Sequence, residues 1–339
     1  KSEELNEHCI PGTEGHEVCA YAIGVATRSN SSYTIKASLN SGWKNPQQLL
    51  LGQPQSSYLE EGNFDYYALL ITQAPEEDPW ESVVVTLTPT DGGMQDLYAT
   101  TNRTREPGPK DYDVKSSSWA GSSVLVFSET APGFCTGCTI FVGVRGFKKG
   151  GYSIVASQGL TRLQEGLPQQ GVIPGGEDGR YYEFFNPPGH RQPIQVVATA
   201  LTGDPDLYVA VGGSDLPGPH NFNWIGGDTG NDFVDILPDD EEFCEDCSYQ
   251  IGLRSAGPSS FTVSVSRGDE STLLVHGRPQ AGKVAAGGIR YYTVRPDLDT
   301  VKMTVTLTES VGSGDIYVAK GNGTTAAGMI DPQDPQTFR

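Results

Sequence analysis

The sequence predicts an all-β protein, built as a tandem array of antiparallel β-sandwich modules of the jelly-roll or immunoglobulin-like (Ig-like) type. One motif recurs about every 110 residues, which is the size of a small domain. The 42 glycines and 23 prolines, together with many Thr, Val and Tyr residues, are typical of short strands joined by turns. Many segments alternate apolar and polar residues as half-buried strands do. We therefore expect about eight strands in each module.

The repeated motif is clearest in residues 203–209, which read GDPDLYV. Related segments cover residues 94–99 and 313–318. The final acidic residue of each copy, the Leu or Ile after it and the next Tyr recur in all three segments. We interpret the motif as a turn that leads into a buried strand.

The copies divide the chain into four parts. Residues 1–41 match the C-terminal part of a module, residues 47–157 and 160–266 are two complete modules, and residues 272–339 match the N-terminal part of a further module. The two complete modules repeat their strand, tryptophan and cysteine positions in the same order. In chain order, strands are expected at 21–25, 33–37, 64–69, 83–88, 124–127, 138–144, 152–156, 180–184, 194–200, 204–209, 233–236, 247–253, 261–265, 290–294, 301–308 and 315–318.

The partial modules at the two ends have three explanations. The chain is cut from a longer array, its two partial modules close on each other, or the next subunit completes the C-terminal part. A composite of residues 272–339 and 1–41 would lack the strand that corresponds to Val124–Phe127, and a missing strand leaves an open sheet edge. We therefore favour a segment of a longer repeat protein.

Charge and hydropathy exclude two classes of partner. The net charge of −19 argues against DNA or RNA, because nucleic-acid binding depends on Lys and Arg that neutralise phosphates. The sequence contains no run of 18 apolar residues, so no membrane span is predicted in this segment. Residues 1–7 lack the basic start and apolar middle of a signal peptide, so any targeting segment is expected outside this sequence.

The six cysteines form three local pairs, each just before an expected strand. The pairs are Cys9 with Cys19, Cys135 with Cys138, and Cys244 with Cys247. A zinc site would need two cysteine pairs to meet, but the pairs lie a module apart. A redox motif should stand at the start of a helix, whereas these pairs stand at the start of expected strands. Local disulfides in an oxidising compartment are therefore favoured. Three glycosylation sequons, at Asn30, Asn102 and Asn322, agree with a secreted glycoprotein.

Two sets of residues are candidate ligand-binding groups. Asp204 and Asp206 stand two residues apart on an extended segment, so their carboxylates can share a calcium ion. The ion needs roughly six to eight oxygens, and loop carboxylates could add some of them: Asp228, Asp232, Asp239 and Asp240. Met94 and Ser313 replace the first aspartate in the other copies, and the alternative is that the second aspartate accepts backbone N–H groups in the turn. Trp119 and Trp224 occupy matching positions, where a tryptophan either packs in the core or stacks on a sugar ring.

No catalytic motif is present in the sequence. The five histidines are scattered among loops, with no HExxH, no GxSxG and no glycine-rich phosphate loop. We therefore expect no enzymatic activity from this segment and no certain cofactor.

The pattern resembles a known family. The segments that carry the resemblance are Tyr181-Tyr182, 196–202, 203–209, 247–253 and 261–265. Together they are similar to the pre-peptidase C-terminal domain (PPC), a secreted β-sandwich found beside bacterial peptidase domains and related to collagen-binding modules. Cysteine-containing tandem versions occur in surface and secreted proteins of algae and protists. The resemblance covers both complete modules and the start of the third, and it implies an accessory role that includes calcium binding in some members.

The expected function is structural. The sequence predicts a repeat segment of a large extracellular or cell-surface protein, acting as a spacer or as the body of a filamentous or adhesive appendage, such as a flagellar hair or a cell-wall layer. Its partners would then be neighbouring copies or modules of the same protein. The alternative is a set of accessory domains that bind matrix or glycans for a secreted hydrolase.

Overall fold

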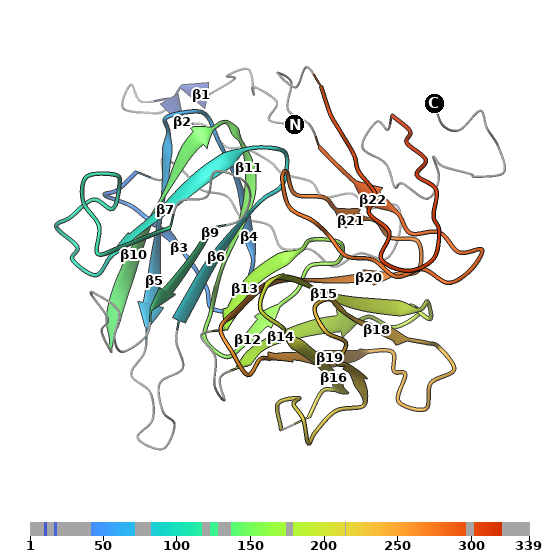
Figure 1. The fold of residues 1–339 in the computed structure, drawn as a ribbon. Coiled ribbons are helices and arrows are strands. Elements are labelled where there is room, and N and C mark those ends of the chain that lie inside the picture. The colour runs from blue at the N-terminus through green and yellow to red at the C-terminus, as the bar shows by residue number, and fades with distance from the viewer. Residues whose placement is uncertain are drawn as a thin grey trace. The chain divides into compact units, whose positions relative to one another are not determined.

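The computed structural model describes residues 10–11, 17–18, 42–71, 83–116, 123–127, 137–173, 179–213, 215–295 and 302–320. Within these residues the chain contains strands and no helix, as Figure 1 shows. It divides into two compact units, Lys1–Leu39 and Asn40–Arg339. The predicted all-β class is confirmed.

The N-terminal unit contains one described pair of strands. Strand β1 (Ile10–Pro11) pairs antiparallel with β2 (Glu17–Val18), with Ile10 opposite Val18. The expected strands at 21–25 and 33–37 lie outside the described residues, as do Cys9, Cys19 and Asn30.

The larger unit begins with two sheets that form the first sandwich. The strands are β3 (Gln47–Gln48), β4 (Gln55–Leu59), β5 (Phe64–Ile71), β6 (Val83–Pro89), β7 (Met94–Thr100), β8 (Val114–Ser116), β9 (Ser123–Phe127), β10 (Cys138–Lys148) and β11 (Gly150–Ser157). One sheet has the order β3-β5-β10-β7-β8 and the other the order β4-β11-β6-β9. The central strands are therefore β10 in the first sheet, and β11 and β6 in the second.

The second sandwich repeats this order strand by strand. Its strands are β12 (Leu160–Arg162), β13 (Gln169–Ile173), β14 (Gly179–Asn186), β15 (Ile194–Thr202), β16 (Asp206–Val211), β17 (Trp224–Gly226), β18 (Asp232–Ile236), β19 (Cys247–Arg254) and β20 (Ser259–Arg267). The sheets have the orders β12-β14-β19-β16-β17 and β13-β20-β15-β18. In each sandwich the opening strand pairs parallel with the second strand of its sheet, and all other pairs are antiparallel.

Each sandwich has its own apolar core between its two sheets. In the first, Val83, Val85 and Leu87 of β6 are at most 1% exposed, because alternate residues of a strand point to the same side. In the second, Leu207 and Val209 of β16 are fully buried. The repeated motif therefore leads into a buried strand, as predicted.

The third part of the chain is less regular than the two sandwiches. It contains β21 (Thr272–Leu273) and β22 (Tyr292–Thr293), a parallel pair that matches the parallel opening pairs of the two sandwiches. Beyond β22, residues 302–320 contain no strand, although strands were expected at 301–308 and 315–318. Figure 1 draws this red segment without arrows. An alternating pattern makes a strand only when a neighbouring strand accepts its hydrogen bonds, and none does so here among the described residues.

Candidate functional site

The turn of the repeated motif is tightly fixed in the second sandwich. Gly203 has a φ of 75°, and a Cβ there would lie 2.6 Å from the Pro258 carbonyl oxygen, so only glycine fits without a shift. The Asp204 carboxylate accepts the Gly230 N–H at 2.6 Å, and the Ser255 hydroxyl donates to the Asp204 carbonyl at 2.9 Å. The turn is therefore bonded both to the loop before β18 and to the loop between β19 and β20.

Asp232, the first residue of β18, is the buried acidic group of this site. It is fully buried, and its two carboxylate oxygens accept the backbone N–H groups of Leu207 at 3.0 Å and Asp228 at 2.9 Å. Burial raises its pKa to about 6, and these two hydrogen bonds hold the pKa lower than burial alone would. The charges of Asp206 and Asp228 raise the pKa further. Asp232 thus ties the start of β16 to β18.

The predicted calcium ligands Asp204 and Asp206 lie at the edge of this site. Burial raises the pKa of Asp206, and the nearby charge of Asp204 raises it further. Asp232 uses both oxygens on backbone groups. Among the described residues, no group of three or more His, Cys, Asp or Glu side chains is placed to hold a metal ion. Calcium binding at Asp204 and Asp206 stays a prediction.

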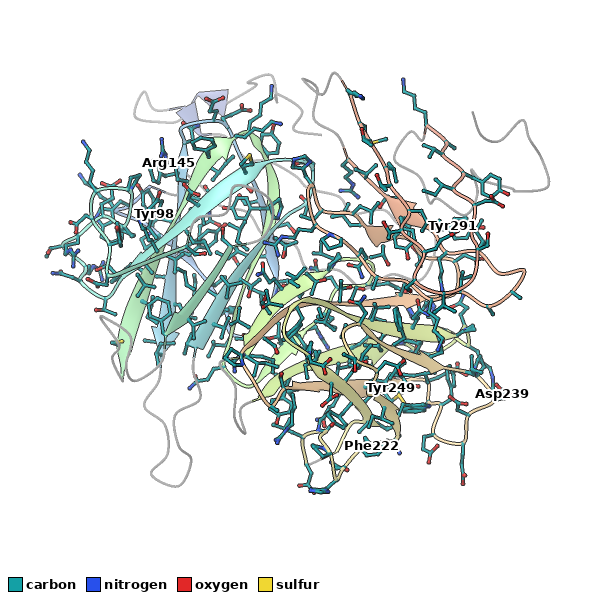
Figure 2. All side chains as sticks on the ribbon, in the orientation of Figure 1. Tyr98, Arg145, Phe222, Asp239, Tyr249 and Tyr291 are labelled. Atoms are coloured by element: carbon teal, nitrogen blue, oxygen red, sulfur yellow. A yellow bond between two sulfur atoms is a disulfide. The ribbon has the colours of Figure 1, made fainter. Side chains whose placement is uncertain are left out.

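The corresponding site in the first sandwich is built differently. Ser123 stands at the position of Asp232 and donates to the Gln95 carbonyl at 3.3 Å. Asp96 accepts the Tyr98 hydroxyl at 3.2 Å, and burial raises its pKa. Figure 2 shows Tyr98 close to Arg145, whose charge lowers the pKa of Asp96. The acidic cluster around residue 232 is therefore specific to the second sandwich.

Trp224 packs at the edge of the second core. Its indole N–H donates to the Asp240 carboxylate at 2.9 Å, and its ring meets Tyr249 edge to face at 5.9 Å between centroids. Because the side chain is half-buried, part of the ring is covered by its own sandwich. Its stacking on a sugar stays a prediction.

The predicted match between Trp119 and Trp224 is wrong, because Val114 lies opposite Ala99 in the first sandwich as Trp224 lies opposite Val209 in the second. Trp119 itself lies outside the described residues.

One of the three predicted disulfides is described in full. Cys244 and Cys247 are bonded, with 6.1 Å between their Cα atoms, and Cys247 is the first residue of β19. The Cys244 N–H donates to the Tyr249 hydroxyl at 2.9 Å, which fixes the loop against the core. Cys138 is also disulfide-bonded, and its predicted partner Cys135 lies outside the described residues.

A hollow of about 250 Å³ lies on the first sandwich, and sequence reasoning did not identify it. It is lined by Trp43, Lys44, Pro46, Arg103 and Phe141. The Trp43 ring stands edge to face with Phe141, at 5.3 Å between centroids. Trp43 belongs to the connector before β3, and its contact with β10, about 100 residues later, left no periodic signal in the sequence.

The sequon at Asn102 adjoins this hollow in the chain. Asn102 is exposed, and its side-chain carbonyl accepts both the backbone N–H and the hydroxyl of Thr104, at 3.0 and 2.8 Å. These bonds form an Asx turn that presents the side chain on the surface. Asn322, the third predicted glycosylation site, lies outside the described residues.

Comparisons with known proteins give no family for this chain. No family model matches it, and no curated protein matches it. One solved structure that was aligned with the chain is described as "Crystal structure of BuGH86E322Q in complex with neoagarooctaose". The alignment covers 64% of this chain and 34% of that chain, at 12% identity and a TM-score of 0.15. A likeness this weak carries no argument about fold or function.

Proposed function

We propose that the chain is a structural repeat segment of a large extracellular or cell-surface protein. It acts as a spacer or as the body of a filamentous or adhesive appendage, for example a flagellar hair or a cell-wall layer. The repeats belong to a PPC-like type of β-sandwich, and the array itself has no enzymatic role. The disulfide at Cys244 and Cys247 supports an oxidising compartment.

The observation that carries this proposal is a joint that occurs twice in the same form. Gly52 and Gly166 are equivalent residues, both with a φ of 71°. Each donates its N–H to the closing strand of its own sandwich, at Ala156 and Val265. Each carbonyl then accepts an N–H from the opening strand of the next part: Gly52 from Arg162 at 3.1 Å, and Gly166 from Leu273 at 2.7 Å.

A repeated joint of this kind suits a spacer. Only two residues, Gln158 and Gly159, separate β11 from β12, so the linker between the two sandwiches is short. A Cβ at Gly166 would lie within 2.3 Å of the Ser271 carbonyl oxygen, which makes the approach of the two parts dependent on glycine. Stacking the same unit through the same contact gains length by repetition.

Immunoelectron microscopy of the source cells tests this proposal. An antibody raised against residues 40–339 should label a repeating structure at the cell surface. Labelling confined to the cell interior would contradict the structural role. Recovery of the antigen only as part of a soluble secreted enzyme would contradict it as well. A preimmune serum serves as the control.

The hollow at Trp43 favours a second function, the binding of glycans or matrix. An aromatic ring beside Lys44 and Arg103 offers a stacking face and two cations, which suits an acidic sugar. Binding of acidic oligosaccharides should be lost in Trp43→Ala and kept in Trp224→Phe. Equal binding by the two variants would remove the hollow from consideration.

A further inference from the structure

The hollow on the first sandwich and the sequon at Asn102 share one residue. Arg103, which lines the hollow, is the middle residue of the sequon Asn102-Arg103-Thr104. Thr100 of β7 lies directly opposite Phe141 of β10, which also lines the hollow. The Thr100 hydroxyl accepts the Asn102 backbone N–H at 3.1 Å. The sequon therefore lies beside the hollow in space as well as in the chain.

The turn that carries Asn102 is fixed by hydrogen bonds. The Asn102 side-chain carbonyl accepts the Thr104 N–H and hydroxyl, and the Asn102 backbone carbonyl accepts the Arg105 N–H at 3.0 Å. Arg105 pairs with Asp111 and Asp113, which anchors the turn to the rest of the loop. No described residue accepts a hydrogen bond from the Asn102 side-chain nitrogen, the atom that carries an N-linked glycan. A glycan would thus start from a fixed point, which reduces the entropy lost when it packs on the protein.

The hollow offers an aromatic face of a size that suits one sugar ring. Its volume is about 250 Å³, below the roughly 300–1,000 Å³ of pockets that hold drug-sized ligands. Trp43 is half-buried, and its ring stands edge to face with Tyr66 and Phe141, at 5.8 and 5.3 Å between centroids. The exposed Lys44 and Arg103 supply hydrogen-bond donors for the oxygens of a sugar. The hollow can therefore hold a neutral sugar through an aromatic face and charged donors.

The second sandwich has neither the sequon nor the aromatic residues of the hollow. At the positions of Trp43, Phe141 and the sequon asparagine it has Ser157, Gln250 and Gly212. A glycine offers no side chain for a sugar. The sequon and the aromatic hollow thus occur together in one sandwich and are absent together from the other, as expected if one serves the other.

We propose that an N-linked glycan on Asn102 is held in the hollow, with its first sugar stacked on Trp43. The glycan then covers part of the outer face of β10 and the connector before β3. This inference goes beyond the proposed structural function and does not depend on it. A glycan in this place would exclude an added acidic sugar, so the second function proposed above would apply only to chains without this glycan.

Calorimetry of glycosylated and unglycosylated chains tests this inference. The full chain is secreted from a host that attaches N-linked glycans, with Asn30→Gln and Asn322→Gln so that only Asn102 is modified. Asn102→Asp supplies the unglycosylated chain, because an aspartate keeps the acceptor for the Thr104 N–H and hydroxyl.

The expected result is a glycan effect that depends on Trp43. The glycan should raise the melting temperature of the first sandwich by about 4 °C in chains that have Trp43 and by less than about 1 °C in Trp43→Ala. Because each comparison is made within one variant, any cost of Trp43→Ala itself cancels. Trp224→Phe, a matched change in the second sandwich, should keep the full rise.

Nuclear magnetic resonance of the isotope-labelled glycan gives an independent readout. A proton over the face of an aromatic ring is shielded by that ring. The protons of the first sugar should therefore shift upfield in chains with Trp43, and the shift should be absent in Trp43→Ala.

Three results would overturn the inference. The first is an unmodified Asn102 in the mass spectrum of the secreted chain. The second is a glycan whose protons do not shift, and the third is an equal rise in melting temperature with and without Trp43. Each of these results would leave the structural function standing, because the antibody labelling tests that function separately.

Discussion

The buried carboxylate of Asp232 gives the second sandwich a defined dependence on pH. Replacing it by Asn keeps the shape of the side chain and removes its titration. The folded chain binds the Asp232 proton more tightly than the unfolded chain does, because the pKa rises from 3.8 to about 6 on folding. Between about pH 4 and pH 6 the folded state therefore holds more protons, and this group makes the free energy of unfolding fall as pH rises.

The size of this effect follows from the pKa shift. A rise of about two pKa units corresponds to about 3 kcal/mol of stability. This contribution is lost as pH rises through the window, and above the window it no longer changes with pH. The difference in stability between wild type and Asp232→Asn should thus change by about 3 kcal/mol between pH 4 and pH 7. The absolute offset between the two proteins also contains the loss of one acceptor for the Leu207 or Asp228 N–H, about 1–3 kcal/mol, which does not depend on pH.

Hydrogen exchange at the amides of β19, followed in urea at pH 4 to 7, measures the second sandwich separately from the first. Asp239→Asn is the control, because Asp239 is exposed in the same sandwich and its removal should leave the slope unchanged. Parallel pH profiles for wild type and Asp232→Asn would refute the claim that folding raises the pKa of Asp232.

Three further changes test the packing. Leu87→Ala removes a fully buried side chain and should lower the free energy of unfolding in urea by about 2–5 kcal/mol. Leu307 is 49% exposed, so Leu307→Ala should lower it by less than about 1 kcal/mol. Equal losses would show that the third part has a closed core. Tyr152→Phe removes the hydrogen bonds of the Tyr152 hydroxyl to the buried Tyr67 hydroxyl and to the buried Asp65 carboxylate. It should lower the free energy of unfolding by about 1–3 kcal/mol in the same assay. An unchanged urea midpoint would argue against these two hydrogen bonds. Replacing Cys244 and Cys247 by Ser removes a disulfide that closes a very short loop, so the free energy of unfolding of the second sandwich should fall by about 2 kcal/mol in calorimetry. A loss above about 5 kcal/mol would show that the disulfide does more than restrict the unfolded chain.

Alternation and repetition allowed much of the fold to be predicted. The expected strand at 83–88 is β6 (Val83–Pro89), and the one at 124–127 is β9 (Ser123–Phe127). Both have apolar residues at alternate positions, which predicts a strand with one face in a core. This describes β9, whereas β6 is buried at all seven positions and therefore on both faces. The short parallel pairs that open each sandwich were not predicted, because two or three residues carry no period.

The polar site was less predictable than the strands. Asp204 and Asp206 stood out because they belong to the repeated motif. Asp232, the buried group that holds β16, is 25 residues from its partner Leu207, and its counterpart in the first sandwich is Ser123. A contact between residues of two different strands leaves no spacing signal in a single sequence, and the two sandwiches do not share this contact.

The third part shows the limit of pattern reasoning most directly. Residues 301–308 alternate in the same way as β6, yet the described residues 302–308 form no ladder. The alternation identifies which side chains need cover, and it does not identify the strand that provides it.

Cross-linking mass spectrometry on a native surface preparation tests the central claim most directly, because it identifies the neighbours of this chain in place. We predict abundant cross-links between different copies or modules of the same protein. Cross-links confined to a single chain, or to a peptidase or glycosidase domain, would contradict the structural function and favour an accessory binding role.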